Sequence, residues 1–193
     1  DNFRSSPEIL ALSSSILPTM ESLTPKMQSG RLPTIRAELN EYEEARSVAS
    51  LVKELAIGNI TLGDQAVLVR THAQIPPIAE VFKDHDIKFR VASDSEPGAG
   101  AGSGDEVEIL TLHAAKGLEW KIVHLCGVEE GFHPIAHANT ELALGEERRL
   151  FFVGLTRAEE ELHISWARNR SLGSKRSRKN RQITTTCSQV IVY

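Results

Sequence analysis

The clearest hydrophobic pattern in the chain runs from Glu41 to Ile57, where apolar residues recur every three or four positions. One stripe of this segment is formed by Tyr42, Ala45, Ala49, Val52 and Ala56, with Val48 and Leu55 beside it. Such spacing predicts an amphipathic helix, and Gly58 is a typical residue to end one. An earlier helix is predicted to start at Ser5-Ser-Pro7, because proline favours the first turn. Its apolar residues are Ile9, Leu10, Leu12 and Ile16.

Short apolar runs between the helical patterns predict strands. Ala66 to Arg70 has the continuous apolar character of a strand buried in a parallel sheet. A helix from about Ile78 to His85 and a strand from Ile87 to Val91 follow. Further strands are predicted where Val107, Ile109 and Thr111 alternate with their neighbours, at Lys121 to Gly127, and at Leu162 to Trp166. Strands that alternate with helices indicate an α/β domain with a mostly parallel sheet.

Two segments interrupt this pattern. Ala92 to Asp105 is rich in Gly, Ala and Ser, a composition typical of a flexible linker. Arg168 to Arg181 carries seven basic residues and no acidic one, which fits either a solvated tail or a flexible arm that contacts phosphates. We therefore divide the chain into residues 1–92 and 107–167 of one domain, a linker at 93–106 and a basic tail at 168–193.

Composition sets only broad limits. The chain has 193 residues, a net charge of -4 and 40% hydrophobic residues, values that are ordinary for a soluble domain with one sizeable core. No apolar run approaches the roughly 20 residues of a membrane span. Cys126 and Cys187 form no metal-binding or redox pattern. We expect no membrane association, no metal ligands in this chain, a monomer and a reduced, cytoplasmic setting.

Candidate chemistry is concentrated in the second half. The strand that ends at Thr111 continues into a polar turn containing Lys116-Gly117, and Glu119 follows. Further on, Arg149, Val153 and Arg157 are spaced by four residues, which would place two guanidiniums on nearly one face of a helix. Arginine forms planar, bidentate hydrogen bonds to phosphate oxygens and stabilises charge during phosphoryl transfer. These two segments therefore predict a site for the phosphates and ribose of a nucleotide.

Three motifs carry a resemblance to a known family. The first is Thr111-Leu-His-Ala-Ala-Lys-Gly-Leu-Glu-Trp120, followed by Val123-His-Leu-Cys-Gly127 and Glu129-Glu-Gly-Phe-His-Pro134. It resembles motif V of the superfamily 1A DNA helicases, the UvrD/PcrA/Rep group. Glu146-Glu-Arg-Arg-Leu-Phe-Phe-Val-Gly-Leu-Thr-Arg-Ala158 resembles their motif VI, and Asn2-Phe-Arg-Ser5 resembles motif IV, which is usually Asn-Tyr-Arg-Ser. The resemblance implies a RecA-like fold, the second motor domain called 2A.

The resemblance also implies roles in nucleotide binding. Arg157 would reach the γ-phosphate of ATP, and Arg4 would be a second phosphate-sensing arginine, so both are candidate catalytic residues. Phe3 replaces the family's tyrosine and keeps the π-face that stacks on adenine. Glu119 would accept a hydrogen bond from the ribose. Gly117 and Arg149 complete the expected nucleotide site.

A second set of residues is implied to contact DNA. Thr111 and His113 correspond to positions that face the DNA strand in this family, and a hydroxyl and an imidazole can bind phosphate oxygens without reading sequence. Arg70-Thr71-His72 resembles the family's Arg-Thr-Asn segment, another contact to the DNA backbone. His72 stands where the family has asparagine, so the resemblance does not decide whether this residue contacts DNA. The implied partner is single-stranded DNA or a junction between single-stranded and double-stranded DNA.

Three features of the family are missing from the chain. No segment fits the phosphate-binding loop G-x-x-x-x-G-K-[ST], and no acidic Walker B strand is visible. In the family both belong to the first motor domain, 1A, which would hold most of the Mg²⁺ contacts. The large 2B subdomain is also missing, and the Gly-rich segment stands at its position. Either the natural protein lacks 2B, or an engineered linker replaces it; the repeated Gly-Ala favours the engineered linker.

We therefore expect a fragment of an ATP-dependent 3′-to-5′ DNA helicase of DNA repair, which functions with 1A in the same chain and is inactive alone. The alternative is a non-catalytic RecA-like module that binds DNA or a protein.

Overall fold

The structure is a computed structural model that describes residues 5–17, 27–92, 100, 104–172 and 181–184. Within these residues a parallel sheet has the strand order β1-β6-β5-β2-β4-β3, and β7 pairs with β6 in the antiparallel direction. The strands are β1 (Thr34–Asn40), β2 (Gln65–Val69), β3 (Phe89–Val91), β4 (Val107–Thr111), β5 (Trp120–Leu125), β6 (Ala158–Leu172) and β7 (Arg181–Thr184). The expected α/β fold with a mostly parallel sheet is confirmed.

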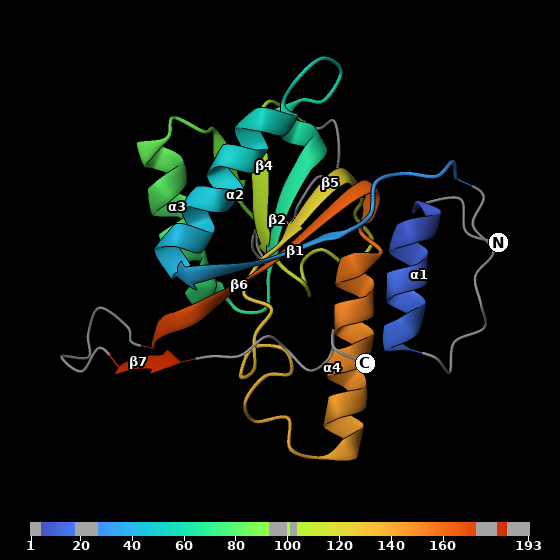
Figure 1. Ribbon diagram of the computed structural model, residues 1–193, viewed down its shortest axis with the longest axis vertical. Coiled ribbons are helices and arrows are strands. Elements are labelled where there is room, and N and C mark those ends of the chain that lie inside the picture. Colours follow the sequence, from blue (N-terminus) through green and yellow to red (C-terminus); the bar gives the residue numbers. More distant parts are fainter. Residues whose placement is uncertain (1–4, 18–26, 93–99, 101–103, 173–180, 185–193) are drawn as a thin grey trace.

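Two pairs of helices cover the sheet, one pair on each face (Figure 1). The helices are α1 (Pro7–Ile16), α2 (Glu41–Leu55), α3 (Ile75–Asp84) and α4 (Glu141–Leu155), with short 3-10 turns η1 (Leu62–Asp64) and η2 (His72–Gln74). Under α1 and α4 lies one apolar cluster that contains Leu68, Leu110, Val123 and Leu162. Under α2 and α3 lies a second cluster that contains Val67, Val69 and Ile109. Neighbouring residues of one strand thus belong to opposite cores, as pleating requires.

Local sequence explains where the helices begin. The side chain of Asn40 accepts hydrogen bonds from the backbone N–H groups of Tyr42 (2.9 Å) and Glu43 (3.0 Å), which caps α2. Thr140 caps α4 in the same way through Ala143 N–H (3.2 Å). Pro7 occupies the first turn of α1, as predicted. The helix predicted from Glu41 is confirmed to within two residues of its end.

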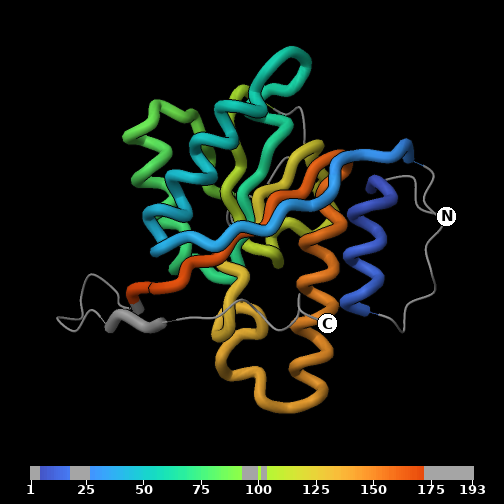
Figure 2. Tube along the Cα trace, in the orientation of Figure 1, coloured from blue at the N-terminus to red at the C-terminus, as the bar shows by residue number. Residues whose placement is uncertain are grey.

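The parallel strands give the sheet two different edges. The segment 112–119 leaves β4 at the carboxyl edge and returns to the amino edge, where β5 begins. Helix α4 makes the same return between β5 and β6. In Figure 2 the connection from β5 to α4 descends below the sheet before α4 rises beside it. Both motif-bearing segments of the second half therefore run from one edge of the sheet to the other.

Three sequence-based expectations change. The strand β1 was not expected, although residues 34–40 alternate between polar and apolar side chains. Strand β6 extends to Leu172 instead of ending near Trp166, so residues 168–172 belong to the sheet and not to a tail. Helix α3 begins at Ile75, three residues earlier than expected. The predicted flexible linker at residues 93–106 lies outside the described residues, apart from Gly100 and residues 104–106.

Candidate functional site

Arg157 lies at the amino edge of the sheet, immediately before β6. Its side chain is almost completely buried, with 7% exposure. Its Nε donates a hydrogen bond to the carbonyl of Val153 (2.9 Å), at the end of α4, and Nη1 donates to the carbonyl of Leu118 (3.0 Å), in the segment after β4. The guanidinium is therefore held in a fixed orientation between the motif V and motif VI segments.

Two further predicted nucleotide residues lie beside Arg157. The backbone N–H of Trp120 donates to the carbonyl of Arg157 (3.0 Å), so Glu119 stands between two residues that are bonded to this arginine. Gly117 has a φ of 88°, a left-handed conformation that favours glycine and turns the chain toward Glu119. The structure thus brings Gly117, Glu119 and Arg157 together, although they come from two motifs.

Ser6, which follows the N-terminal motif in the sequence, is anchored at the same edge. The backbone N–H of Ser6 donates to the carbonyl of Glu159 (3.0 Å), two residues after Arg157. Phe3 and Arg4, which precede this anchor, lie outside the described residues.

Arg149 is not on the same helical face as Arg157. Helix α4 ends at Leu155, so the spacing of four residues does not continue through Arg157. Arg149 is exposed, whereas Arg157 is buried. The expectation that the two guanidiniums point the same way is therefore wrong, because the chain leaves the helix before the second one.

The predicted DNA-contacting residues gather at the opposite, carboxyl edge. Val69 and Thr111 are paired positions at the ends of β2 and β4, and the N–H of Leu112 donates to the carbonyl of Val69 (2.9 Å). The two loops that follow these strands therefore lie side by side. They carry Arg70, Thr71 and His72 on one strand end and Thr111 and His113 on the other. His72 and His113 are exposed, while Thr111 is buried.

Arg70 is bound by a carboxylate of α4. Its Nε donates to Glu147 Oε2 (3.0 Å) and its Nη2 donates to Glu147 Oε1 (2.6 Å), the bidentate geometry that makes such pairs strong. Both side chains are largely buried, with exposures of 12% and 11%. Burial alone would raise the pKa of Glu147, but the hydrogen bonds and charge of Arg70 outweigh it and hold that pKa below its ordinary value.

A network of buried charges, which the sequence did not reveal, lies at the same carboxyl edge of the sheet. Arg170 donates to Glu44 Oε2 through Nη2 (2.5 Å) and to Glu129 through Nε and Nη2. Side-chain exposures of Arg170, Glu44 and Glu129 are 6%, 3% and 0%. Burial raises the pKa of Glu129, and Arg170 only partly offsets the effect. The expectation that Arg170 belongs to a solvated basic tail is wrong, because its charge is neutralised inside the domain.

These carboxylates also bind backbone groups. Glu44 accepts a hydrogen bond from the N–H of Gly127 (2.8 Å), and Glu129 accepts one from the N–H of Ala167 (2.9 Å). The loop after β5 is thus fastened to α2 and β6. The sequence shows that Glu129 is followed by a second acid and that Glu44 belongs to a predicted helix. Neither fact reveals that both carboxylates bind Arg170.

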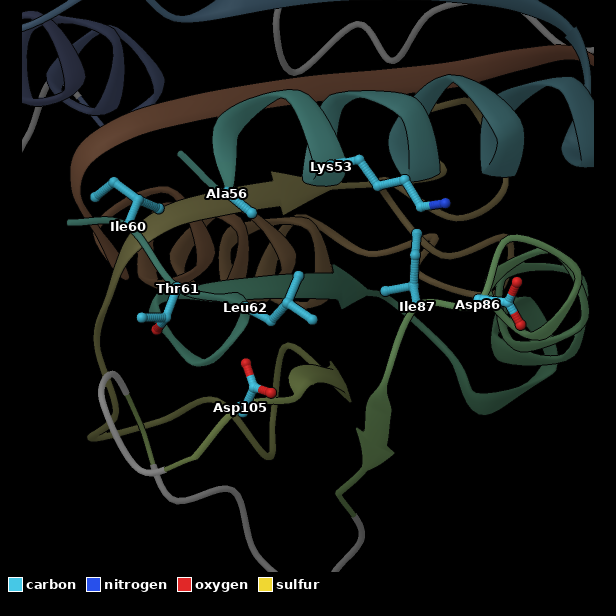
Figure 3. Close-up of a pocket in the computed structure, with 8 residues that line it drawn as sticks. All are labelled: Lys53, Ala56, Ile60, Thr61, Leu62, Asp86, Ile87 and Asp105. Atoms are coloured by element: carbon cyan, nitrogen blue, oxygen red, sulfur yellow. The ribbon is translucent and has the colours of Figure 1, made fainter. Parts of the chain in front are cut away.

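The described residues offer no group of three His, Cys, Asp or Glu side chains that could hold a metal ion. A hollow of about 390 Å³ lies at the amino edge, between the end of α2, η1 and the turn after α3 (Figure 3). Lys53, Asp86 and Asp105 are its charged residues, and Asp105 is paired with Lys88 (3.0 Å). None of the predicted nucleotide or DNA residues lines it. No helix of the described part is long and apolar enough to cross a membrane.

Comparisons with known proteins agree on one family. Residues 1–96 and 93–169 match the model of the UvrD-like helicase C-terminal domain. The chain is 51% identical over 78 residues to the ATP-dependent DNA helicase UvrD2 of Mycobacterium tuberculosis, a match that covers 38% of this chain and 11% of that protein. It is 49% identical over 73 residues to the ATP-dependent DNA helicase PcrA of Bacillus subtilis, covering 37% and 10%. The ATP-dependent DNA helicase Rep of Escherichia coli is 41% identical over 83 residues, covering 43% and 12%.

A solved structure has the same fold. The C-terminal domain of a possible DNA helicase from Lactobacillus plantarum superposes with a TM-score of 0.67, at 15% identity, over 99% of this chain and 92% of that one. The matches to the curated relatives span only about a tenth of their length. The family model, in contrast, covers most of the sequence, including all three motifs. The chain belongs to the family of UvrD-like helicase C-terminal domains.

Proposed function

We propose that the chain is the second motor domain of an ATP-dependent 3′-to-5′ DNA helicase and completes an ATPase site whose phosphate-binding loop lies on another domain. The observation that carries this proposal is the fixed position of Arg157 between Leu118 and Val153, next to Glu119. A pre-oriented arginine at the edge of a domain can stabilise charge on a phosphoryl group bound by a neighbouring domain.

In this proposal the two edges of the sheet have different tasks. At the amino edge, Arg157 and Arg4 contact the γ-phosphate, Phe3 stacks on the adenine, Glu119 accepts from the ribose, and Gly117 shapes the turn. Arg149, which is exposed on α4, approaches the phosphates from the outside. ATP and Mg²⁺ are held mainly by the 1A domain of the same protein.

At the carboxyl edge, Thr71, His72, Thr111 and His113 contact the phosphates of single-stranded DNA. The exposure of the two histidines supports their part of this role. Contacts of this kind position a strand without reading its sequence. The strand β4 has five residues and is roughly 16 Å long at about 3.3 Å per residue, and the two sets of residues lie at opposite edges of its sheet. ATP turnover and DNA binding should therefore be separable by mutation.

Arg157→Ala in the full-length protein tests this assignment. We expect ATP turnover to fall by about 10³-fold, the typical effect of losing an arginine that stabilises the transition state. Affinity for single-stranded DNA should remain nearly unchanged, because it comes from contacts at the other edge. Arg157→Lys should restore little, since lysine lacks the planar fork. Arg148→Ala, an exposed neighbour on α4, is the matched control.

The measurements are steady-state ATPase rates with and without single-stranded DNA, a DNA titration at fixed salt, and a thermal melt of each variant. Near-normal turnover together with lost DNA binding in Arg157→Ala would mean that the two sites are reversed. A wild-type protein that binds DNA but never hydrolyses ATP would instead support the non-catalytic module.

A further inference from the structure

We propose that Arg70 and Glu147 form a positioning pair through which DNA at the carboxyl edge sets the position of Arg157 at the amino edge. This inference rests on the proposed function, because it concerns the link between its two sites. It changes the role expected for Arg70, which the resemblance implied to be a contact to the DNA backbone. The bidentate bond to Glu147 directs the guanidinium into the domain, toward α4.

The first link joins the DNA-facing turn to Arg70. Gln74 Oε1 accepts hydrogen bonds from the backbone N–H groups of Arg70 (3.0 Å) and Thr71 (2.9 Å), so residues 70–74 form one closed turn. His72 is exposed at the tip of this turn. A phosphate bound at Thr71 and His72 would therefore move the backbone of Arg70 with it.

The second link joins Arg70 to the helix. Glu147 lies in the middle of α4 and is 77 positions from Arg70 in the sequence. Its Oε2 also accepts a hydrogen bond from the backbone N–H of Ile135 (3.2 Å), in the loop after β5. One carboxylate thus fastens the turn after β2 and the loop after β5 to the same point of α4.

The third link joins the helix to Arg157. From Glu147 to Leu155 the helix rises roughly 12 Å, at about 1.5 Å per residue. Val153, in the last turn, provides the carbonyl that accepts from Arg157 Nε (2.9 Å). A shift of α4 along its axis must therefore move the guanidinium relative to the carbonyl of Leu118, which accepts a hydrogen bond from Nη1. Every step from Thr71 to Arg157 is a hydrogen bond or a helix.

Contiguity alone does not establish coupling, so the test measures coupling directly. The variant is Glu147→Gln in the full-length protein, which removes the charge and keeps the shape. We expect basal ATPase activity within about twofold of wild type and DNA affinity within about threefold. The stimulated rate at saturating single-stranded DNA should fall by roughly 5- to 150-fold, the usual range for coupling between sites. Glu43→Gln, which breaks the exposed pair between Glu43 and Arg46, is the matched control.

A double-mutant cycle identifies the pair. Because Arg70 and Glu147 act through each other, Arg70→Gln combined with Glu147→Gln should reduce the DNA-stimulated rate no further than the single change at Glu147. On the isolated chain, the Nε proton of Arg157 should exchange with water faster in Glu147→Gln, a change that NMR detects in the absence of ATP and DNA.

Several results would overturn the inference. One is full stimulation at saturating DNA in Glu147→Gln, especially with tighter DNA binding, because a released Arg70 would then be acting as a phosphate contact. Additive losses in the double variant, or a parallel drop in melting temperature and basal rate, would reduce the pair to a structural role. A wild-type protein whose ATPase activity does not respond to DNA would refute the proposed function itself and this inference with it.

Discussion

Replacing Arg170 with alanine should destabilise the domain more than any other single change to a charged residue on β6. The substitution leaves Glu44 and Glu129 buried without their cation, at side-chain exposures of 3% and 0%. Removing one partner of a buried ion pair typically costs about 3–5 kcal/mol in the free energy of unfolding. For a chain of this size that corresponds to a decrease in melting temperature of roughly 6–20 °C. The contact of the Arg170 guanidinium with the ring of Phe132 is lost as well.

The assay is urea unfolding followed by tryptophan fluorescence, since Trp120 is completely buried. Arg168→Ala, an exposed arginine two positions earlier, should change the free energy of unfolding by less than about 0.5 kcal/mol. The loss in the free energy of unfolding caused by Arg170→Ala should also be smaller at lower pH. Without Arg170 the pKa of Glu129 rises further above its ordinary value. The folded protein then binds a proton more tightly than the unfolded chain, so the free energy of unfolding decreases as the pH increases. A loss below about 1 kcal/mol, or one that is larger at pH 5 than at pH 7.5, would contradict this account.

The other predictions concern the sheet and its helices. Burial lowers the pKa of His124 from its ordinary value of 6.5 to about 3, so the unfolded chain binds a proton below pH 6.5 that the folded chain does not. Stability should then decline by up to about 1.4 kcal/mol per pH unit between pH 6.5 and 4, and urea titrations of His124→Asn should show a shallower decline. Gly154→Ala would place a Cβ 2.4 Å from Cδ2 of the buried Leu112, so we expect a loss of roughly 1–3 kcal/mol in thermal unfolding. Asn40→Ala removes the cap of α2 and should cost about 1 kcal/mol in the same measurement; an unchanged melting curve would refute either of the last two.

Periodicity was sufficient to predict the sheet interior and the helices. Strands β2 and β4 are five-residue segments buried along their full length, and such runs stand out in a sequence. Strand β1 was missed although it alternates regularly, because an exposed edge strand lacks the strong apolar signal of a buried one. Its Ile35 and Leu39 are 48% and 61% exposed. A count of period-two alternation between the loop at Pro33 and the helix at Glu41 would have found it.

The pairings of charged residues could not be predicted in the same way. Arg70 and Glu147 are 77 positions apart, and Arg170 and Glu44 are 126 apart. Which carboxylate meets which guanidinium depends on strand order, and strand order is not contained in any local pattern. A basic run such as the one that begins at Arg168 indicates solvation or phosphate binding equally well until its neighbours are known. The buried position of Arg170 is a property of the long strand β6, whose length local propensity did not reveal.

Two segments that run from one edge of the sheet to the other explain how one domain can carry candidate site residues at both edges. The segment 112–119 carries His113 at the carboxyl edge and Glu119 at the amino edge, and α4 makes the same crossing. The two segments touch where Gly154 packs on Leu112, at a distance that leaves no room for a Cβ. Glycine weakens a helix by about 1 kcal/mol relative to alanine, so its presence here is explained by the close approach. A larger residue would separate the two segments and, with them, the carbonyls of Leu118 and Val153 that jointly orient Arg157.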